Sequence, residues 1–421
     1  MGPQSATRPK KGPSRPVKVE AERLALQMAV PLLNGLYALL KLLPVRHKVV
    51  FISWNSDGPS LDFRVLADRL SQLPNPPKVV FLCRELRHGA GQKLVYTFHL
   101  LHQMYAFATA ETVALDAYCP LASILRHRPS LRVIQLWHAI GAFKKFGWSI
   151  VDKSEGWSAQ SNIPSRTLSR LMRMHNGYTS AVVSYAGAIP YFAEAFAADP
   201  SIFHVAWLPR VELLRDDRWM AGLRQRILAA HPELAGRRVV VYAPTMRRTA
   251  IDTWRVDSLV EAVAGSDWAM IVKPHPVRGE RQEPVFPGRT VDVADFSAVQ
   301  LLALADAVIT DYSAIVYEAY LRGTPVYFFA DDMAEYEQAR GFYTHPSQFP
   351  SRIYATADEL VRDLVAGVGD RGAMERFVDT YLEDSPRRQD ILDLFLPAAS
   401  PKASPVPPNP AMSLASFGPM G

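Results

Sequence analysis

The feature that most constrains this chain is a repeated alternation of short β-rich runs with helical patterns. Five β-rich runs fall in the first half: Val49–Ser53, Val79–Leu82, Thr112–Asp116, Val133–Trp137 and Ala181–Ser184. Four follow in the second half: Val239–Ala243, Ala269–Val272, Ala307–Thr310 and Val326–Phe329. Strands that alternate with helices form parallel sheets covered by helices on both faces. The pattern predicts an α/β protein with two doubly wound, Rossmann-like domains that face each other across a central cleft.

A charged helical stretch around Asp216–His231 separates the two sets of strands. We expect a disordered basic tail over residues 1–20, an amphipathic helix over 21–44, a first domain over 45–210, a second domain over 211–396 and a disordered Pro-rich tail over 397–421. Three residue pairs in the second domain have the spacing of a capping box, which marks a helix start: Ser258 with Glu261, Ser297 with Gln300, and Thr356 with Glu359.

The most apolar stretch of the chain is Leu24–Leu43. After Pro31 its leucines recur at helical spacing and form one apolar stripe: Leu32, Leu33, Leu36, Leu39, Leu40 and Leu43. Polar residues such as Gln27 and Asn34 interrupt the stretch, whereas a membrane span needs about 20 predominantly apolar residues. Three interpretations stay open: a helix that lies on a membrane, a helix that packs on the protein, and a span. The basic tail before it would attract an anionic leaflet.

Composition and absent motifs exclude several classes of protein. Hydrophobic residues make up 48 % of the 421 residues, which excludes a mostly disordered chain. The two cysteines, Cys83 and Cys119, cannot form a disulfide framework or a four-cysteine zinc site, and we expect free thiols in a reducing compartment. No GxGxxG follows a predicted strand, and the sequence contains no P-loop, no GxSxG and no Asp-x-Asp motif, so a metal-independent mechanism is expected. The net charge of +6 suits phosphate-bearing substrates, nucleic acid or an anionic membrane without choosing between them.

The unusual residues follow the strands, where open α/β sheets bind their ligands. After the fourth strand come His138, which could accept a proton near neutral pH, and the paired Lys144 and Lys145, which could meet an anion. The alternative is a structural histidine beside a solvated basic loop. Because basic residues do not alternate with aromatic residues along the chain, nucleic acid is not an expected partner.

The second domain shows three further groups at strand ends. Thr245 and Arg247 follow its first strand, and an arginine fork matches phosphate oxygens. Lys273 and His275 follow the next strand, where two prolines fix the backbone. A last group begins the following helix and could cap it or bind a pyrophosphate at its N-terminus: Asp311, Tyr312 and Ser313. Glu318 lies further along that helix and could point back to a ribose or face solvent.

Together these blocks resemble the CDP-glycerol glycerophosphotransferase family of teichoic acid synthesis. The similarity runs from about Val49 to Asp390 and rests on five short blocks in the order typical of the family: Gln135–His138 with Phe143–Gly147, Leu208–Arg210, Tyr242–Arg247, Lys273–Pro276 and Thr310–Ala314. The resemblance implies a GT-B architecture with an acceptor-side first domain, a CDP-donor-binding second domain and the active site between them. It also implies a peripheral enzyme on the cytoplasmic face of the bacterial membrane, and the basic tail and leucine stripe agree with that.

The resemblance implies a reaction and a role for each candidate residue. An alditol phosphate, most readily glycerol phosphate, passes from a CDP-alditol to a hydroxyl of a lipid-linked polyol or saccharide, and CMP leaves. By the same resemblance, His138 is the proposed base and His275 lies by the donor pyrophosphate. The donor side further comprises Arg247, Thr245, Lys273, Asp311, Tyr312, Ser313 and Glu318, and the acceptor side Lys144 and Lys145.

Two other functions remain open at this stage: a GT-B glycosyltransferase that uses a nucleotide sugar, and a non-catalytic subunit of a polymer-assembly complex. Single addition and polymerisation also both stay open, and a homo-oligomer is compatible with the sequence.

Overall fold

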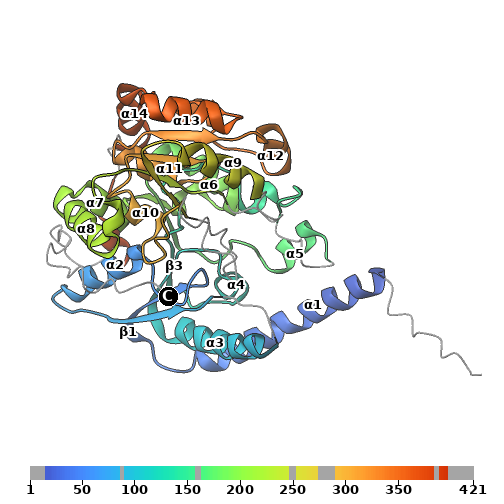
Figure 1. The fold of residues 1–421 in the computed structure, drawn as a ribbon. Helices are drawn as coiled ribbons and strands as arrows, with labels where there is room; N and C mark the ends of the chain where they lie inside the picture. The colour runs from blue at the N-terminus through green and yellow to red at the C-terminus, as the bar shows by residue number, and fades with distance from the viewer. Residues whose placement is uncertain are drawn as a thin grey trace, which may run out of the picture.

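The computed structural model describes residues 15–85, 90–156, 163–245, 253–273, 290–383 and 388–396, which form two parallel β-sheets covered by helices (Figure 1). The first sheet consists of β1 (Arg46–Ser53), β2 (Lys78–Cys83), β3 (Ala110–Leu115), β4 (Arg132–Gln135), β5 (Ser180–Val183) and β6 (Phe203–Val205). The second consists of β7 (Arg238–Tyr242), β8 (Trp268–Val272), β9 (Ala307–Thr310), β10 (Val326–Phe329) and β11 (Ile353–Tyr354). The α/β class and the two parallel sheets expected from the sequence are confirmed.

The helices alternate with these strands along the chain. In the first half they are α1 (Arg15–Leu40), α2 (Leu61–Ser71), α3 (Ala90–Thr109), α4 (Pro120–Ile124), α5 (Ser165–Leu171) and α6 (Ile189–Phe196). The junction contains α7 (Pro209–Arg215) and α8 (Asp217–Ala230). In the second half they are α9 (Thr253–Ala264), α10 (Ala298–Leu301), α11 (Ile315–Leu321), α12 (Met333–Ala339), α13 (Ala357–Ala366) and α14 (Arg371–Val378).

Both sheets have the same strand order at their centre. The first runs β2-β1-β3-β4-β5-β6, and the second runs β11-β10-β9-β7-β8, with parallel pairing throughout. The chain direction across each sheet therefore reverses once, between β1 and β3 and between β7 and β9. Ligands of open α/β sheets bind beyond the carboxyl ends of the strands at such a switch point.

Each β-rich run of the sequence coincides with an observed strand; β9 and β10 begin and end at the predicted residues, and the ends of the other strands differ by at most three residues. The sequence analysis missed β6 and β11, because edge strands of three and two residues are too short to show a pattern.

The capping box of Ser297 with Gln300 is confirmed, with both reciprocal hydrogen bonds formed. The one predicted at Ser258 is wrong, because Ser258 lies inside α9, which begins at Thr253. Thr356 precedes α13 as expected, but its side chain caps no N–H group.

The two halves share hydrophobic packing instead of meeting only through a linker. Buried residues of both sheets belong to one cluster. Helix α7 contacts α2 of the first half and α11 of the second. The end of the chain returns to the first half, where Asp390 pairs with Arg69 of α2 at 2.6 Å and Phe395 packs on Phe51. Residues 388–396 thus pack with the first sheet. The sequence analysis placed them in the second domain, over 211–396.

Helix α1 begins at Arg15, earlier than the expected bound at residue 21, and continues through Pro31. Its C-terminal half is fixed to the body by Asn34, whose Nδ2 donates to the Ile124 carbonyl at 3.0 Å and whose Oδ1 accepts from the Arg126 N–H at 2.8 Å. Tyr37 is completely buried beside it. Residues 1–14 and 397–421, where the sequence predicts disordered tails, lie outside the described residues.

Candidate active site

His138 follows β4 at the carboxyl edge of the first sheet, as the sequence analysis expected. The residue before it, Trp137, has φ 61°, a left-handed conformation that is costly for a bulky side chain. The Trp137 N–H donates to Gln135 Oε1 at 3.0 Å, which helps to hold this bend. Its ring stacks on Phe146 at 4.8 Å and lies 4.5 Å from the imidazole of His138. The fold thus maintains local strain next to His138, and such strain is typical of functional sites.

The hydrogen bond of His138 fixes its tautomer. Its Nδ1 lies 3.2 Å from the backbone carbonyl oxygen of Asp116, which follows β3. A carbonyl oxygen can only accept, so Nδ1 carries the proton and the neutral ring keeps its lone pair on Nε2. The geometry therefore prepares Nε2 to accept a proton.

The pKa of His138 is lowered to about 4, chiefly because the surrounding protein desolvates the ring. Three cations lower the pKa further: Arg210, Lys144 and Arg340. His138 is nevertheless exposed to solvent, and exposure combined with strong desolvation is typical of a side chain in a recess. The imidazole is consequently neutral at pH 7, and its surroundings are electropositive.

The segment after His138 is held by the second half of the chain. Thr344 Oγ1 donates to the Ala142 carbonyl at 2.8 Å, and the Tyr343 N–H donates to the Phe143 carbonyl at 2.8 Å. A Cβ atom at Gly141 would lie 2.3 Å from the ring of the buried Tyr317, so only glycine fits there. The backbone between His138 and Lys144 is thereby positioned by residues of the other sheet.

Lys144 and Thr245 meet although the sequence analysis placed them on opposite sides of the site. Lys144 Nζ lies 3.5 Å from Thr245 Oγ1. Thr245 follows β7, and its N–H donates to Asp311 Oδ1 at 2.7 Å. Asp311 follows β9, so this bond joins the two strand ends at the switch point of the second sheet. Lys144 thus brings a cation from the first half to the ligand-binding edge of the second.

The other residues of the Asp311 block have structural partners. Asp311 Oδ1 also accepts the Tyr312 N–H, and Asp311 does not cap α11, which begins only at Ile315. Tyr312 is buried, stacks on Tyr336 and donates to Asp332 Oδ1 at 2.8 Å. Ser313 Oγ accepts the Ile315 N–H at 3.5 Å. Within the described residues, Tyr312 therefore packs beneath the loop between β9 and α11 and stabilises it.

The two remaining lysines each contact another part of the protein. Lys145 Nζ lies 4.0 Å from Glu194 of α6 and above the Tyr343 ring. Lys273 Nζ donates to the Val293 carbonyl at 3.1 Å. Arg247 and His275 lie outside the described residues, and their roles stay predictions from the sequence.

Glu318 does not face solvent, which excludes one of the two alternatives that the sequence left open for it. It is buried, and its Oε1 lies 3.6 Å from Arg210 Nη1. Arg210 of α7 also binds Asp62 of α2, with Nη2 2.8 Å from Oδ2 and its backbone N–H 2.8 Å from Oδ1. Burial raises the pKa of Glu318 to about 7. Arg210 therefore links the two halves through buried carboxylates, and it also contributes to the positive potential at His138.

The sequence analysis missed Asp116, although a residue at a strand end was the signal it used elsewhere. Asp116 is buried, and its Oδ1 has no hydrogen-bond partner among the described residues. Burial raises its pKa from an ordinary 3.8 to about 7, and the negative charge of Asp62 adds to that rise. Asp116 therefore carries both this buried carboxyl group and the backbone carbonyl that orients His138.

This raised pKa predicts a pH-dependent stability. The folded protein binds the Asp116 proton more tightly than the unfolded chain, so the stabilisation is complete below about pH 4 and is lost as the pH rises through about 7. Between pH 5 and pH 8, we expect the melting temperature of the Asp116→Asn variant to fall less than that of the original protein. Thermal unfolding at both pH values measures the difference, and parallel slopes for the two proteins would contradict the prediction.

Comparisons with known proteins agree with this geometry. A family model described as CDP-Glycerol:Poly(glycerophosphate) glycerophosphotransferase matches residues 36–385. The teichoic acid ribitol-phosphate primase of Bacillus spizizenii is 31 % identical over 86 % of this chain and 95 % of its own length. The teichoic acid poly(ribitol-phosphate) polymerase of the same organism is 26 % identical over 87 % of this chain but only 58 % of its own length.

Solved structures show the same fold. The wall teichoic acid polymerase TagF, as an H444N variant, superposes with a TM-score of 0.65 at 16 % identity and covers 87 % of this chain and 94 % of the solved chain. The two-sheet, GT-B-like fold is therefore shared with a teichoic acid enzyme. From the family match over most of its length, we conclude that this chain belongs to the CDP-Glycerol:Poly(glycerophosphate) glycerophosphotransferase family.

Proposed function

We propose that this protein transfers an alditol phosphate from a CDP-alditol to a hydroxyl of a lipid-linked acceptor in teichoic acid synthesis and releases CMP. The observation that carries the proposal is His138, a neutral imidazole with its Nε2 lone pair free of the Asp116 bond and with cations around it. Relatives that are teichoic acid primases and polymerases support the reaction class. TagF has been solved after soaking with CDPG, which supports a CDP-linked donor.

The proposed step is an in-line displacement at the β-phosphorus of the donor. His138 Nε2 takes the proton of the acceptor hydroxyl as its oxygen bonds to the β-phosphorus. The bond from that phosphorus to the bridging oxygen breaks, and CMP leaves with the oxygen. Catalysis of phosphoryl transfer rests mainly on positioning and on stabilising charge. Cationic side chains near His138 supply that stabilisation in this proposal.

The low pKa of free His138 fits this role once the donor is bound. A base of pKa about 4 is weak, since the best general bases have a pKa near the working pH. A pyrophosphate that pairs with Lys144 would offset one of the cations that lower the pKa of His138 and so raise that pKa toward neutrality. Donor binding would then strengthen the base at the moment when it is needed.

The comparisons favour priming over polymerisation and ribitol over glycerol. The ribitol-phosphate primase is 31 % identical to this chain, whereas the poly(ribitol-phosphate) polymerase is 26 % identical. The glycerol-phosphate primase of Bacillus spizizenii is 27 % identical over only 59 % of this chain. We therefore take CDP-ribitol as the first donor to test, ahead of the CDP-glycerol expected from the sequence.

Donor specificity separates this function from its alternatives. Purified protein with a bacterial membrane extract as acceptor source would receive CDP-ribitol, CDP-glycerol, UDP-N-acetylglucosamine or GDP-mannose, with and without EDTA. We expect CMP release from a CDP-alditol only. Nucleotide release from a sugar donor alone would favour the glycosyltransferase, and saturable CDP binding without turnover of any donor would favour a non-catalytic subunit.

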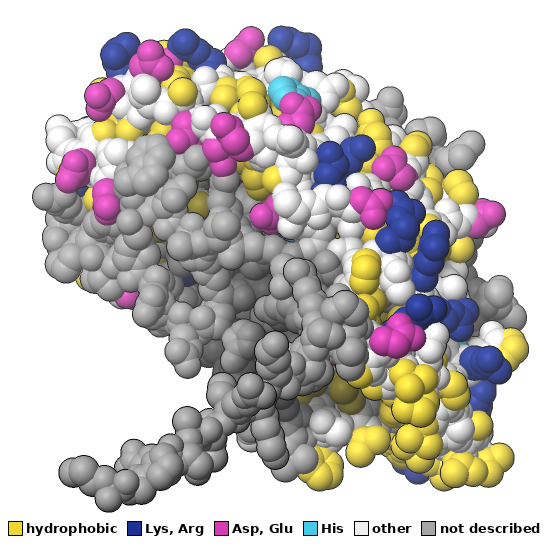
Figure 2. All heavy atoms as spheres, turned by 90° about the vertical axis from the view of Figure 1, so that its right-hand side faces the viewer, with side chains coloured by type: hydrophobic (Ala, Val, Ile, Leu, Met, Phe, Trp, Pro, Cys, Tyr) yellow, Lys and Arg dark blue, Asp and Glu magenta, His cyan; other side chains and the backbone are white. Residues whose placement is uncertain are grey.

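The proposal places the protein on the membrane through α1 and α3. Residues Val19–Leu40 of α1 are long and apolar enough to cross a membrane by length and composition alone. Their inner face packs on the body, and the outer face exposes a stripe at helical spacing: Leu24, Met28, Leu32, Leu36 and Leu39. Helix α3 lies beside α1 and adds exposed Val95, Phe98 and Leu101. Figure 2 shows hydrophobic side chains gathered at the lower edge of the molecule, where Figure 1 places both helices, with Lys and Arg side chains above them.

The outer stripe can be tested with vesicles. Inserting a leucine side chain into an apolar layer contributes about 1.5–3 kcal/mol, so Leu32→Glu with Leu36→Glu should reduce binding to anionic vesicles at least tenfold in a flotation assay. The charge-matched control is Val365→Glu with Val368→Glu, which are also exposed but lie at the end of α13. Equal loss in the two double variants would contradict membrane contact through α1.

A further inference from the structure

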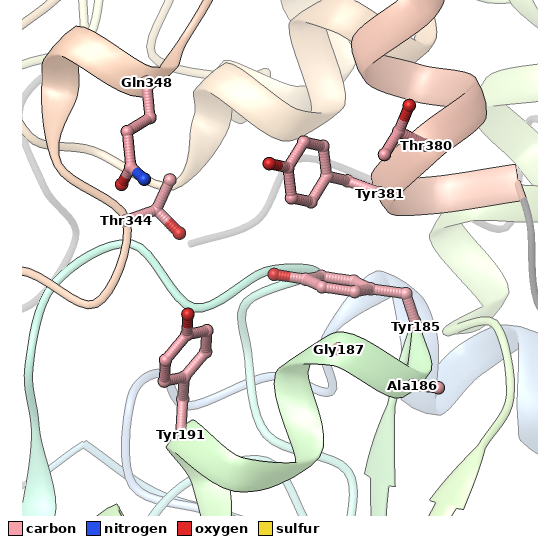
Figure 3. A pocket seen from close by; sticks show the side chains of 8 residues that line it. All are labelled: Tyr185, Ala186, Gly187, Tyr191, Thr344, Gln348, Thr380 and Tyr381. Carbon is pink, nitrogen blue, oxygen red and sulfur yellow. The ribbon is translucent and has the colours of Figure 1, made fainter.

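A cavity lies between the two halves of the chain, and the reaction proposed above gives it no role. It has a volume of about 270 Å³, and both halves contribute to its wall (Figure 3). Tyr185 and Tyr191 come from the segment that follows β5, at the carboxyl edge of the first sheet. The opposite wall consists of Thr344, Gln348, Thr380 and Tyr381.

The described residues that line this pocket are aromatic, hydroxylated or small, with one amide, and none of them carries a charged side chain. Figure 3 shows the hydroxyl groups of Tyr191, Thr344 and Tyr381 directed toward the space between the halves. Gln348 Oε1 accepts the His345 N–H at 2.7 Å, which leaves its NH₂ group as the donor. Aromatic faces contact C–H groups, while hydroxyl and amide groups hydrogen-bond to hydroxyls. This combination suits a neutral, hydroxyl-rich molecule, and none of the described lining residues offers a charge to pair with a phosphate.

The aromatic walls are held in place by neighbouring rings. Tyr185 and Tyr381 meet edge to face across the pocket with centroids 6.1 Å apart. Tyr191 stacks on Tyr343 at 5.0 Å, and Tyr381 packs on Phe377 at 4.5 Å. The ring faces are therefore fixed before a ligand arrives, which lowers the cost of binding.

The pocket is connected to the segment that carries His138. Tyr185 hydrogen-bonds to the backbone of Ala142 and to the Tyr317 side chain. Tyr317 in turn donates to Thr344 Oγ1 at 3.5 Å, and Thr344 donates to the Ala142 carbonyl. Two lining residues thus contact the same residue, four positions after His138. A molecule bound here would lie against the backbone that positions the base.

The volume limits what the pocket can hold. Sites for drug-sized ligands measure about 300–1,000 Å³, so 270 Å³ accommodates one sugar ring or one short polyol rather than a nucleotide diphosphate. We propose that this pocket binds a neutral polyol or saccharide unit of the acceptor and thereby directs the acceptor chain toward His138. This assignment rests on the proposed transferase function and extends it by naming the part of the acceptor that is recognised and the residues that recognise it.

Saturation-transfer NMR on the full-length protein tests the assignment with free ribitol, glycerol and N-acetylglucosamine as probes, both without nucleotide and with saturating CDP. We expect transfer to the C–H protons of at least one probe. The signal should fall at least fivefold in Tyr381→Ala and Tyr191→Ala and be largely retained in Tyr381→Phe, which keeps the ring. Tyr105→Ala, a half-buried tyrosine of α3 outside the pocket, is the matched control. Circular dichroism confirms that each variant is folded.

Three results would overturn the assignment: no transfer to any probe, transfer that CDP or cytidine abolishes, or equal signals in the original protein and both alanine variants. The second result would assign the pocket to the donor. The CMP-release assay keeps this proposal distinct from the transferase function. Probe binding without CMP release from any CDP-alditol would refute the proposed reaction but not the assignment of the pocket. CMP release without probe binding would refute the assignment of the pocket but not the reaction.

Discussion

Replacing His138 with alanine is expected to lower the rate of CMP release by about 10²–10⁴-fold, the usual effect of losing a general base. The donor concentration at half-maximal rate should change little, because the Asp116 bond and the pKa of His138 assign the ring to proton transfer. Initial-rate kinetics with varied donor and fixed acceptor separate the two parameters.

The matched control for this variant is His47→Ala. His47 is exposed at the start of β1, near Glu111 and at the opposite end of the strands from His138. It should retain the original rate. An unchanged rate in His138→Ala would remove this residue from the mechanism. A rise only in the donor concentration at half-maximal rate would reassign it to donor binding.

The Arg210→Met variant is expected to lower the free energy of unfolding by about 3–5 kcal/mol, because removing one partner of a buried ion pair leaves uncompensated charge. Here the change would strand the carboxylates of Asp62 and Glu318, both of which are buried. Since the pKa of Glu318 is about 7, protonation relieves part of this cost in acid, and the loss should be larger at pH 8 than at pH 6. Urea unfolding followed by tryptophan fluorescence measures both values.

The control for Arg210 is Arg371→Ala, which removes an exposed pair with Glu375 on α14. Such a pair contributes about 0.3–0.5 kcal/mol. If the loss in Arg210→Met were no larger than that in Arg371→Ala, or did not depend on pH, Arg210 would not be the electrostatic link between the halves.

The strand ends of this fold could be predicted from the sequence because their signals are local. Runs such as Val239–Ala243 are continuous and apolar, as expected of strands buried on both faces. Residues that directly follow such runs, including His138, Thr245 and Asp311, therefore lie at the carboxyl edges where they were expected. The bond between Thr245 and Asp311 shows that adjacent strand ends do converge.

The long-range pairings could not be predicted in this way. Arg210 was recognised as part of a block between the halves, but its partners Asp62 and Glu318 lie more than 100 residues away on either side. Glu318 looked like a residue of an ordinary helix face because nothing near it in sequence reveals a buried arginine. The pocket between the halves is equally hard to predict, since its lining residues Tyr185 and Tyr381 lie 196 residues apart in the sequence.

The N-terminal helix was placed too late for a local reason. Basic residues dominate the first 18 positions and suggest a solvated tail, yet α1 begins at Arg15 and Pro16 occupies its first turn, where proline is well tolerated. The single leucine stripe expected from spacing divides into two faces. Leu33 and Leu40 pack on the protein, whereas Leu32, Leu36 and Leu39 remain exposed.

The central claim is that an alditol phosphate passes intact from a CDP-linked donor to the acceptor. Mass spectrometry of the lipid-linked product formed from CDP-ribitol, with CMP quantified in the same reaction, tests it most directly. The account predicts an acceptor heavier by one ribitol phosphate and one CMP for each unit added, with both formed about 10²–10⁴-fold more slowly by His138→Ala. An acceptor that gains a sugar mass, or CMP released without any gain by the acceptor, would contradict it.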